Sequence, residues 1–386
     1  MTGVDLASRL ATMNESATLA LNARAKRLSA EGKTIYNLTA GELATDTPDY
    51  IQEAVSKTLK NNKYTAVAGL PELRQKIASH AKEFYGLDWI EAENIVVTGG
   101  AKPALYAAFL SLINPGDEVI IPTPAWVSYV DLVKLAGGAV VTPPLTELYD
   151  LDIEYIKSKI TPKTKAILVT SPHNPTGAVF SEQAIQELSQ LLKGTDIVLI
   201  SDDIYSKLIF DDGFSLVPRA GFKNLVIING FSKSQAITGW RIGYLIADKK
   251  IADAATTLLS HINGNAALPS QYAAIAAMER GDRPPQATLN DLKTKRQIVI
   301  DGLSNIKGLK HNVPGGAFYV YLDIRQLSSN SAEWCENLLA ETGVVLVPGE
   351  AFLTPGYARL TFSGDIEVLK KAVAEIRRFI ETGVKS

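Results

Sequence analysis

The sequence of 386 residues contains a single cysteine, Cys335, and only four histidines. One cysteine cannot form a disulfide within the chain, and the histidines are too scattered for the ligand spacing of a zinc site. We therefore expect a protein of a reducing compartment, with no bound metal. The sequence also lacks any run of about 18 apolar residues, so no transmembrane helix is predicted.

An excess of charge of either sign is also absent. Lys and Arg together number 39 and Asp and Glu number 41, which gives a net charge of -2 at pH 7. Such a balance provides no general attraction to nucleic acid or to anionic lipid, so we expect a small-molecule ligand, no nucleic-acid partner and no membrane partner. Asp5 interrupts the N-terminal stretch where a secretory signal needs apolar residues, which favours a cytoplasmic location.

Several common catalytic and nucleotide-binding motifs are missing. The sequence has no G-x-G-x-x-G, no G-x-S-x-G and no H-E-x-x-H, and Gly32-Lys33-Thr34 lacks the upstream glycine of a P-loop. These absences argue against a dinucleotide-binding fold, a serine hydrolase, a zinc peptidase and a P-loop enzyme.

What the sequence does contain is a regular alternation of two kinds of segment. Hydrophobic residues make up 46% of the chain, enough for a sizeable core. Short β-branched runs alternate with longer amphipathic segments, which is the pattern of βα units around a parallel sheet. The runs predict strands over residues 95–98, 118–121, 139–142, 166–170, 197–201, 225–229 and 242–246. Helices are expected over 101–112 and 181–192.

The pattern changes after Pro284-Pro285. A charged amphipathic segment over 289–306 is followed by apolar runs at 318–322 and 344–347 and by a terminal helix over 366–382, which together predict a smaller α+β domain. A further helix over 17–31 is expected to pack with that domain. We thus divide the chain into an N-terminal arm that forms part of the small domain, a large domain and a small C-terminal domain, with the bounds 1–47, 48–285 and 286–386.

Residues suited to chemistry follow the predicted strands. Asn174, Asp202 and Lys233 each come shortly after a strand, and ligands of open α/β sheets bind beyond the carboxyl ends of the strands. Gly100 and Ala101 follow another strand and open a helix, where free backbone N–H groups favour a phosphate. A phosphate site beside a lysine and a carboxylate suggests pyridoxal phosphate, which needs an amine for its aldehyde and an acid for its pyridine nitrogen.

The motifs that carry these residues resemble those of a known family. The string Ser-Lys-Ser-Gln-Ala-Ile-Thr-Gly-Trp-Arg-Ile-Gly-Tyr over 232–244 joins the Asn-Pro-Thr-Gly at 174–177 and the Asp-x-x-Tyr at 202–205, in order and correctly spaced. Together they resemble the fold-type I, pyridoxal phosphate-dependent aminotransferases of the aspartate aminotransferase family, over about residues 16–362. The resemblance implies an α/β fold with a large domain built on a mostly parallel seven-stranded sheet and a smaller α+β domain.

The resemblance also implies roles around the cofactor. Lys233 would form the Schiff base and carry the proton between Cα and C4′, and Asp202 would pair with the pyridinium nitrogen. Tyr205 and Asn174 would hydrogen-bond the 3-oxygen and lower the imine pKa, and Trp126 would stack on the ring. The phosphate ligands implied are Gly100, Ala101, Lys102, Ser232 and Arg241, together with Tyr64 of a neighbouring subunit, which makes the active unit a homodimer.

The same family pattern implies how the substrate is held. Arg359 would clamp the α-carboxylate with its planar fork, aided by Gly41, Trp126 and Asn174. The chain resembles a bacterial subgroup in which a lysine replaces the distal arginine, so Lys102, Ser16 and Thr18 would receive the side-chain carboxylate of aspartate or glutamate. Two stretches depart from the family: residues 41–45 read Gly-Glu-Leu-Ala-Thr rather than Gly-Glu-Pro-Asp-Phe, and 261–267 lacks the common Ser/Thr-rich version.

The leading hypothesis is therefore L-aspartate:2-oxoglutarate transamination by ping-pong chemistry, with amino acids and 2-oxo acids as substrates. Within the fold, the alternatives are an aromatic or prephenate, an alanine or a kynurenine-type aminotransferase, or a lyase acting at Cβ. The alternative of a different class is a non-catalytic ligand-binding module. The presence of Lys233, Asp202 and Arg359 argues against it, because a site that no longer catalyses a reaction could lose any of these residues.

Overall fold

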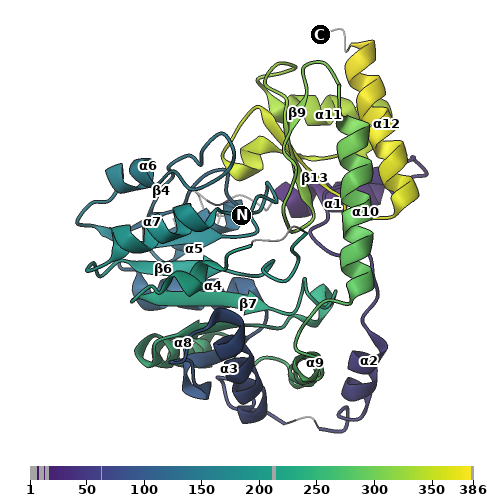
Figure 1. Ribbon diagram of the computed structural model, residues 1–386. Coiled ribbons are helices and arrows are strands. Elements are labelled where there is room, and N and C mark those ends of the chain that lie inside the picture. The colour runs from purple at the N-terminus through teal and green to yellow at the C-terminus, as the bar shows by residue number, and fades with distance from the viewer. Residues whose placement is uncertain (1–6, 8–12, 14–16, 62, 211–213, 384–386) are drawn as a thin grey trace, which may run out of the picture.

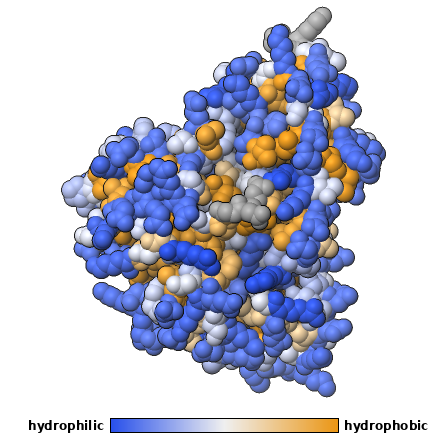
Figure 2. Space-filling model, viewed as in Figure 1, coloured by the Kyte–Doolittle hydropathy of each residue, from blue (hydrophilic) through white to orange (hydrophobic). Residues whose placement is uncertain are grey.

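The computed structural model describes residues 7, 13, 17–61, 63–210 and 214–383. It consists of a region built on a large sheet, which we call the sheet region, and a C-terminal region that lies above it in Figure 1. The long helix α10 (Gln286–Leu303) runs upward from the sheet region into the C-terminal region. The face seen in Figure 2 is predominantly hydrophilic around its rim, and hydrophobic residues show mainly towards its middle.

The sheet region contains seven strands in the order β2-β8-β7-β6-β5-β3-β4. All neighbours pair in parallel except β8, which is antiparallel to both β2 and β7. The predicted α/β fold with a mostly parallel seven-stranded sheet is therefore confirmed. The strands are β2 (Ile95–Thr98), β3 (Glu118–Ile120), β4 (Ala139–Val141), β5 (Thr164–Thr170), β6 (Val198–Asp202), β7 (Leu225–Gly230) and β8 (Gly243–Ala247).

Helices cover both faces of this sheet, which explains the continuous apolar runs. Along β2, Ile95 and Val97 belong to one hydrophobic cluster, whereas Val96 belongs to another on the opposite face. The first cluster includes side chains of α2 (Asp49–Ser56), α3 (Pro71–Tyr85), α6 (Ile153–Ser158), α7 (Glu182–Leu192) and α9 (Leu268–Glu279). The second includes those of α4 (Ala101–Leu112), α5 (Val127–Leu135) and α8 (Lys249–Ile262).

The C-terminal region packs its helices against a small antiparallel sheet of order β12-β13-β10-β9. Its last helix begins where Asp365 accepts hydrogen bonds from two free backbone N–H groups, as an N-cap does. Its elements are β9 (Lys310–His311), β10 (Tyr319–Asp323), α11 (Ser331–Thr342), β11 (Val344–Val345), β12 (Val347–Pro348), β13 (Tyr357–Thr361) and α12 (Ile366–Thr382).

The N-terminal segment lies against the C-terminal region. Strand β1 (Tyr36–Asn37) pairs in parallel with β11, and Ala25 of α1 (Ala17–Ala30) shares a hydrophobic cluster with Leu339 and Val345. The chain then returns to the sheet region, where α2 packs against α9. Residues 17–39 are thus joined to a part of the chain that follows them by about three hundred residues, counted from the β1–β11 register.

Several element boundaries differ from the sequence-based expectation. The apolar run 344–347 forms two short strands rather than one, because β11 pairs with β1 while β12 pairs with β13. The charged amphipathic segment noted over 289–306 forms helix α10, which begins at Gln286, directly after Pro285, and ends at Leu303. Within the described ranges, no helix is long and apolar enough to cross a membrane.

Candidate active site

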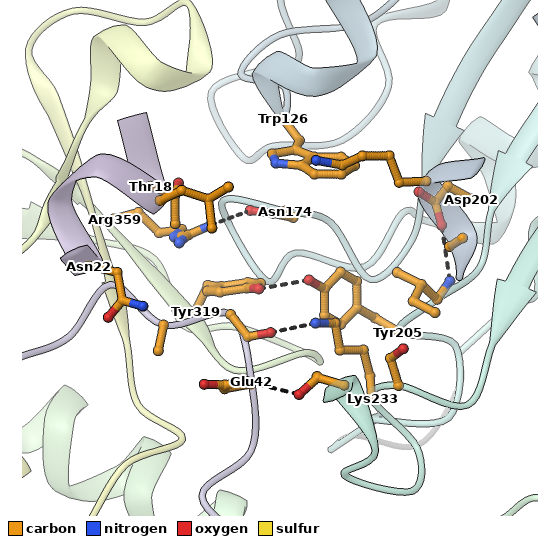
Figure 3. Close-up of a pocket in the computed structure, with 18 of the residues that line it drawn as sticks. Thr18, Asn22, Glu42, Trp126, Asn174, Asp202, Tyr205, Lys233, Tyr319 and Arg359 are labelled. Atoms are coloured by element: carbon orange, nitrogen blue, oxygen red, sulfur yellow. Dashed lines mark hydrogen bonds between the residues drawn. The ribbon is translucent and has the colours of Figure 1, made fainter. Parts of the chain in front are cut away.

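A cavity of about 340 Å³ lies at the carboxyl ends of the parallel strands, between the sheet region, the C-terminal region and α1. Figure 3 shows its lining side chains, which come from elements far apart in the sequence. Most of the predicted site residues line it: Thr18, Gly41, Ala101, Lys102, Trp126, Asn174, Asp202, Tyr205, Ser232, Lys233, Arg241 and Arg359.

Lys233 follows β7 and reaches into this cavity. Its Nζ donates a hydrogen bond to the backbone oxygen of Gly41, which lies in the segment after β1. Burial is the main reason why the pKa of the Lys233 amine is lowered to about 8; the charges of Arg241 and Arg359 act in the same direction, and those of Glu42 and Asp202 oppose it. The amine is therefore neutral in about one molecule in ten at pH 7, far more often than an exposed lysine, and the neutral amine is the form that acts as a nucleophile.

Asp202 ends β6 and is 2% exposed. Its Oδ2 accepts a hydrogen bond of 2.8 Å from the hydroxyl of Tyr129, and its Oδ1 accepts one of 3.2 Å from the backbone N–H of Ile204. Burial raises the pKa of the Asp202 carboxyl to about 6, and the hydrogen bond from Tyr129 limits the rise. Asp203, in contrast, does not line the cavity and accepts a hydrogen bond of 2.6 Å from Ser201.

Tyr205 and Asn174 each make a hydrogen bond to a residue of the C-terminal region. The hydroxyl of Tyr205 is 2.7 Å from that of Tyr319 on β10, and Asn174 Oδ1 accepts a hydrogen bond of 3.0 Å from Nη1 of Arg359 (Figure 3). With its oxygen engaged, the side-chain amide of Asn174 has its nitrogen left to donate.

Arg359 lies on β13 and is 2% exposed. Its Nη2 donates to the backbone oxygen of Thr39 at 2.9 Å, whereas its Nε is buried without a hydrogen-bond partner among the described residues. Within that part of the chain, no carboxylate forms an ion pair with it. A surface salt bridge is thus not its role, and a buried guanidinium with a vacant donor is suited to an anionic ligand.

The N-terminus of α4 forms another anion-binding corner. Gly100 precedes the helix at φ 113°, and a Cβ there would lie 2.6 Å from Nη2 of Arg241, so only glycine lets the guanidinium approach the helix so closely. Ser232 and the backbone of Ala101 line the same cavity. Helix N-terminal N–H groups, a guanidinium and a hydroxyl make up a donor set that fits a phosphate.

Lys102 and Trp126 form a third side of the cavity. Nζ of Lys102 lies 4.8 Å from the centre of the Trp126 ring, and burial, followed by the charge of Arg241, lowers the pKa of this amine. Thr18 contributes from α1. Ser16, predicted to act beside it, lies outside the described residues.

Tyr64 was expected to act on the site of a neighbouring subunit. It does not line the cavity of its own chain, and its side chain is 97% exposed. Tyr64 could therefore contribute to a cavity of this kind only in a second copy of the chain.

Eight lining residues were missed by the sequence analysis: Leu19, Asn22, Ala40, Glu42, Tyr129, Ile204, Thr238 and Tyr319. Tyr129 could have been found, because it follows Trp126 by three residues at the start of a helix, and this spacing brings the two side chains together. The rings are in fact 5.2 Å apart in an edge-to-face arrangement. Tyr319 gave no such signal, since it stands in an ordinary apolar strand.

Taken together, the cavity combines an amine of lowered pKa, a buried carboxylate and a phosphate corner. These are the groups that pyridoxal phosphate requires, so the residues present fit this cofactor. The fold and the cavity thus define a pyridoxal phosphate-dependent enzyme.

Comparisons with known proteins agree with this class. The family profile described as aminotransferase class I and II matches residues 33–376. An aspartate aminotransferase of Thermotoga maritima is 39% identical over 380 residues, covering 97% of this chain and 99% of that protein. An aspartate/prephenate aminotransferase of Thermus thermophilus is 36% identical over 383 residues, covering 97% and 98%. The crystal structure of the Thermotoga maritima protein matches with a TM-score of 0.92 at 38% identity, over 97% of this chain and 100% of that one.

The chain therefore belongs to the aminotransferase class I and II family. It is a pyridoxal phosphate-dependent aminotransferase, as the motifs of the sequence predicted.

Proposed function

We propose that this aminotransferase transfers the amino group between L-aspartate and 2-oxoglutarate. The observation that carries the proposal is that, besides Lys233 and Arg241, the cavity is lined by Arg359 and Lys102, and neither of these two forms an ion pair with a carboxylate within the described residues. Two such cations suit a substrate with two carboxylates, and aspartate, glutamate and their 2-oxo acids have that character. The relatives named aspartate aminotransferase support this choice.

Arg359 would hold the α-carboxylate, because its buried planar fork has a vacant Nε donor. Gly41 lies beside the same cavity and would offer its backbone, as would the side chains of Asn174 and Trp126. Lys102 would meet the second carboxylate, with Thr18 from α1 and Ser16 beside it. The pKa of the Lys102 amine is lowered in this cavity. A bound carboxylate would raise that pKa again, so we expect the substrate to keep Lys102 charged.

Pyridoxal phosphate, when bound, supplies an aldehyde that captures amines and a ring that withdraws electrons from the substrate Cα. Lys233 is the amine placed to hold that aldehyde and, once free, to take the proton from the substrate Cα and deliver it to C4′. The carboxylate of Asp202 would accept a hydrogen bond from the protonated ring nitrogen. The positive charge there would lower the pKa of the Asp202 carboxyl again, and the hydrogen bond from Tyr129 fixes the carboxylate in place.

Tyr205 and Asn174 would donate hydrogen bonds to the 3-oxygen of the cofactor. The interaction of Asn174 Oδ1 with Arg359 leaves the amide nitrogen in the donating position, so the substrate clamp also orients a cofactor ligand. Arg241, Ser232 and the N-terminus of α4 at Gly100 and Ala101 would hold the phosphate. Tyr64 would complete the phosphate site of a second copy, which is why we propose a homodimer.

The same proposal includes the organisation of the chain. Residues 1–47 and 286–386 would form a small domain beside a large domain of residues 48–285, a division supported by the pairing of β1 with β11. The single cysteine supports a reducing compartment, and we propose the cytoplasm.

Steady-state kinetics with a panel of amino donors and 2-oxo acids test the proposal. We expect parallel double-reciprocal lines for aspartate with 2-oxoglutarate, as a ping-pong reaction gives, and the highest kcat/KM for the dicarboxylic pair. A higher kcat/KM for alanine, kynurenine, aromatic amino acids or prephenate would overturn the substrate assignment. Release of pyruvate and ammonia without a 2-oxo acid acceptor would instead indicate a lyase acting at Cβ.

A further inference from the structure

Tyr319 lies between two of the residues just described, yet neither the motifs nor the proposed reaction gives it a role. It is 1% exposed on β10, and its hydroxyl is 2.7 Å from the hydroxyl of Tyr205. The face of its ring lies 4.4 Å from the guanidinium carbon of Arg359. Figure 3 shows the Tyr319 ring between these two side chains, with the dashed line to Tyr205.

The surroundings leave little freedom to the Tyr319 hydroxyl. Gly41 passes so close that a Cβ at that position would lie 3.2 Å from the hydroxyl oxygen. The phenyl ring of Phe318, which packs edge-on against Tyr205 at 5.6 Å, fixes the other partner. The hydrogen bond between the two hydroxyls is therefore held in place from several sides.

The direction of this hydrogen bond follows from the charges around it. Burial raises the pKa of both phenols, but the positive charge of Arg359 is the largest effect opposing it at Tyr319, whereas Tyr319 itself raises the pKa of Tyr205. Either hydroxyl can donate at this distance, and the guanidinium 4.4 Å from the centre of the Tyr319 ring favours Tyr319 as the donor and Tyr205 as the acceptor. The one proton of Tyr205 is then left to point at another acceptor.

We propose that Tyr319 is a positioning residue with two functions: its hydroxyl orients the proton of Tyr205 towards the 3-oxygen of the cofactor, and its ring supports the guanidinium of Arg359. The inference rests on the proposed roles of Tyr205 and Arg359. An O–H group that accepts a hydrogen bond becomes a stronger donor, so Tyr319 also strengthens the hydrogen bond that Tyr205 makes.

The inference predicts a change in the pH at which the absorbance of the bound cofactor changes. Charged and titratable groups that face Tyr205 and Lys233 come from several elements: Tyr319, Arg359, Tyr129, Glu42, Arg241 and Asp202. The substitution Tyr319→Phe changes only one of them and keeps the ring. Tyr205 then becomes a weaker donor, so negative charge on the 3-oxygen is less stabilised. The midpoint of the pH titration of the cofactor's absorbance, which we call the midpoint, should therefore rise by about half a pH unit.

Two further measurements separate the hydroxyl from the ring. Tyr319→Phe should leave the KM for aspartate within about twofold of the wild-type value, because the ring still faces Arg359. Tyr319→Leu removes the ring as well and should raise that KM by roughly three- to tenfold, which corresponds to a cation–π contact. If Tyr319 only stabilised the fold, loss of the hydroxyl would not shift the midpoint while leaving the KM for aspartate nearly unchanged.

The matched control is Tyr321→Phe. Tyr321 lies two residues along the same strand, is fully buried and makes a hydroxyl hydrogen bond of 2.6 Å to Thr354, but it does not line the cavity. Its loss should leave the midpoint unchanged. In a Tyr205→Phe background, Tyr319→Phe should also leave the midpoint unchanged, because the proton that Tyr319 orients is gone.

The inference is overturned if Tyr319→Phe leaves the midpoint at its wild-type pH, if Tyr321→Phe moves it equally, or if the shift persists in the Tyr205→Phe background. If the wild-type protein binds the cofactor and transaminates aspartate but Tyr319→Phe shows no shift of the midpoint, only the role of Tyr319 is contradicted. A wild-type protein that fails to transaminate aspartate contradicts the proposed function instead.

Discussion

The buried guanidinium of Arg359 donates from Nη1 to the side-chain oxygen of Asn174 at 3.0 Å. Arg359 belongs to β13 of the C-terminal region, and Asn174 follows β5 of the sheet region, so this one hydrogen bond joins the two regions across the cavity. A substrate carboxylate that binds Arg359 therefore contacts a residue that is hydrogen-bonded to Asn174, a proposed ligand of the cofactor.

Replacement of Arg359 by lysine should lower kcat/KM for aspartate by about 100-fold, because a lysine cannot reproduce the planar fork or the simultaneous hydrogen bonds to Asn174 and Thr39. Steady-state kinetics measure the effect. Arg325→Lys is the control: Arg325 is exposed and pairs with Asp323 on the surface, so kcat/KM should stay within about twofold. An unchanged kcat/KM for Arg359→Lys would contradict its role in substrate binding.

Borohydride reduction of the cofactor-loaded protein should attach the pyridoxyl group to Lys233. Peptide mapping by mass spectrometry should find the label on that residue in the wild type and in Lys102→Ala, and on no residue in Lys233→Ala. The reason is that Lys233 combines burial, a lowered pKa and a place beside Asp202 and the phosphate corner. A label on Lys102 or on the buried Lys207 would rule out the assignment of Lys233.

The buried carboxyl of Asp203 should make the stability of the cofactor-free protein depend on pH. Burial raises its pKa to about 7, and its Oδ2 has no hydrogen-bond partner within the described residues. A carboxyl whose pKa is raised on folding favours the folded state at low pH, and this contribution is lost as the pH rises from about 4 to about 7.

Denaturant unfolding at several pH values tests this linkage. Asp203→Asn should become progressively more stable than the wild type across that range, by a few kcal/mol at most on the basis of roughly 1.4 kcal/mol per pH unit. The exposed Asp196→Asn provides the control and should follow the wild type. A difference between Asp203→Asn and wild type that does not vary with pH would refute the assignment.

A buried ion pair anchors the turn that follows Lys233. Asp282 is fully buried, pairs with Lys207 and accepts hydrogen bonds from Ser234 at 2.8 Å and from Gln235 at 3.1 Å. Asp282→Ala leaves the Lys207 charge buried without its partner, and should reduce the free energy of unfolding by about 3–5 kcal/mol.

The double variant Lys207→Met/Asp282→Leu should recover part of that loss, since it removes both charges. Lys370→Ala breaks an exposed ion pair with Glu367 and should cost less than about 1 kcal/mol. Equal effects of Asp282→Ala and Lys370→Ala in denaturant unfolding would show that the buried pair has no special importance.

Gly100→Ala should weaken cofactor binding by roughly tenfold. The substitution forces an alanine into a backbone at φ 113° and places its Cβ 2.6 Å from Arg241 Nη2, which pushes the guanidinium out of the proposed phosphate corner. Absorbance titration of the cofactor-free protein with pyridoxal phosphate measures the change in Kd. In Gly239→Ala, the added Cβ meets no atom within 4 Å, and Kd should be unchanged.

The sequence predicts those parts of the fold in which local pattern and burial agree. Strand β2 and helices α4 and α12 begin and end where predicted, because each is a continuous apolar or amphipathic run with a clear boundary residue. The run 344–347 divides into β11 and β12 because two different partner strands, β1 and β13, compete for it. Nothing in the run itself reveals those partners.

The candidate site shows the same division. Lys233 and Asp202 were found because each follows a predicted strand and stands in a motif of the family, and Arg359 was found because its position resembles that of the family's carboxylate-binding arginine. Tyr319 and Glu42 were not, because their place in the cavity depends on how the C-terminal region and the N-terminal segment meet the sheet. Contacts that arise only from such tertiary packing leave no periodic signal in the sequence.

The parallel pairing of β1 with β11 also has a consequence for synthesis of the protein. Residues 36 and 37 leave the ribosome about three hundred residues before their partners, Val344 and Val345. Until then, the apolar side of α1 around Ala25 has no neighbour to cover it. The nascent N-terminal segment therefore lacks these partners until about three hundred further residues have been synthesised, and a chain that stops before residue 344 has neither β11 nor Arg359 of the candidate site.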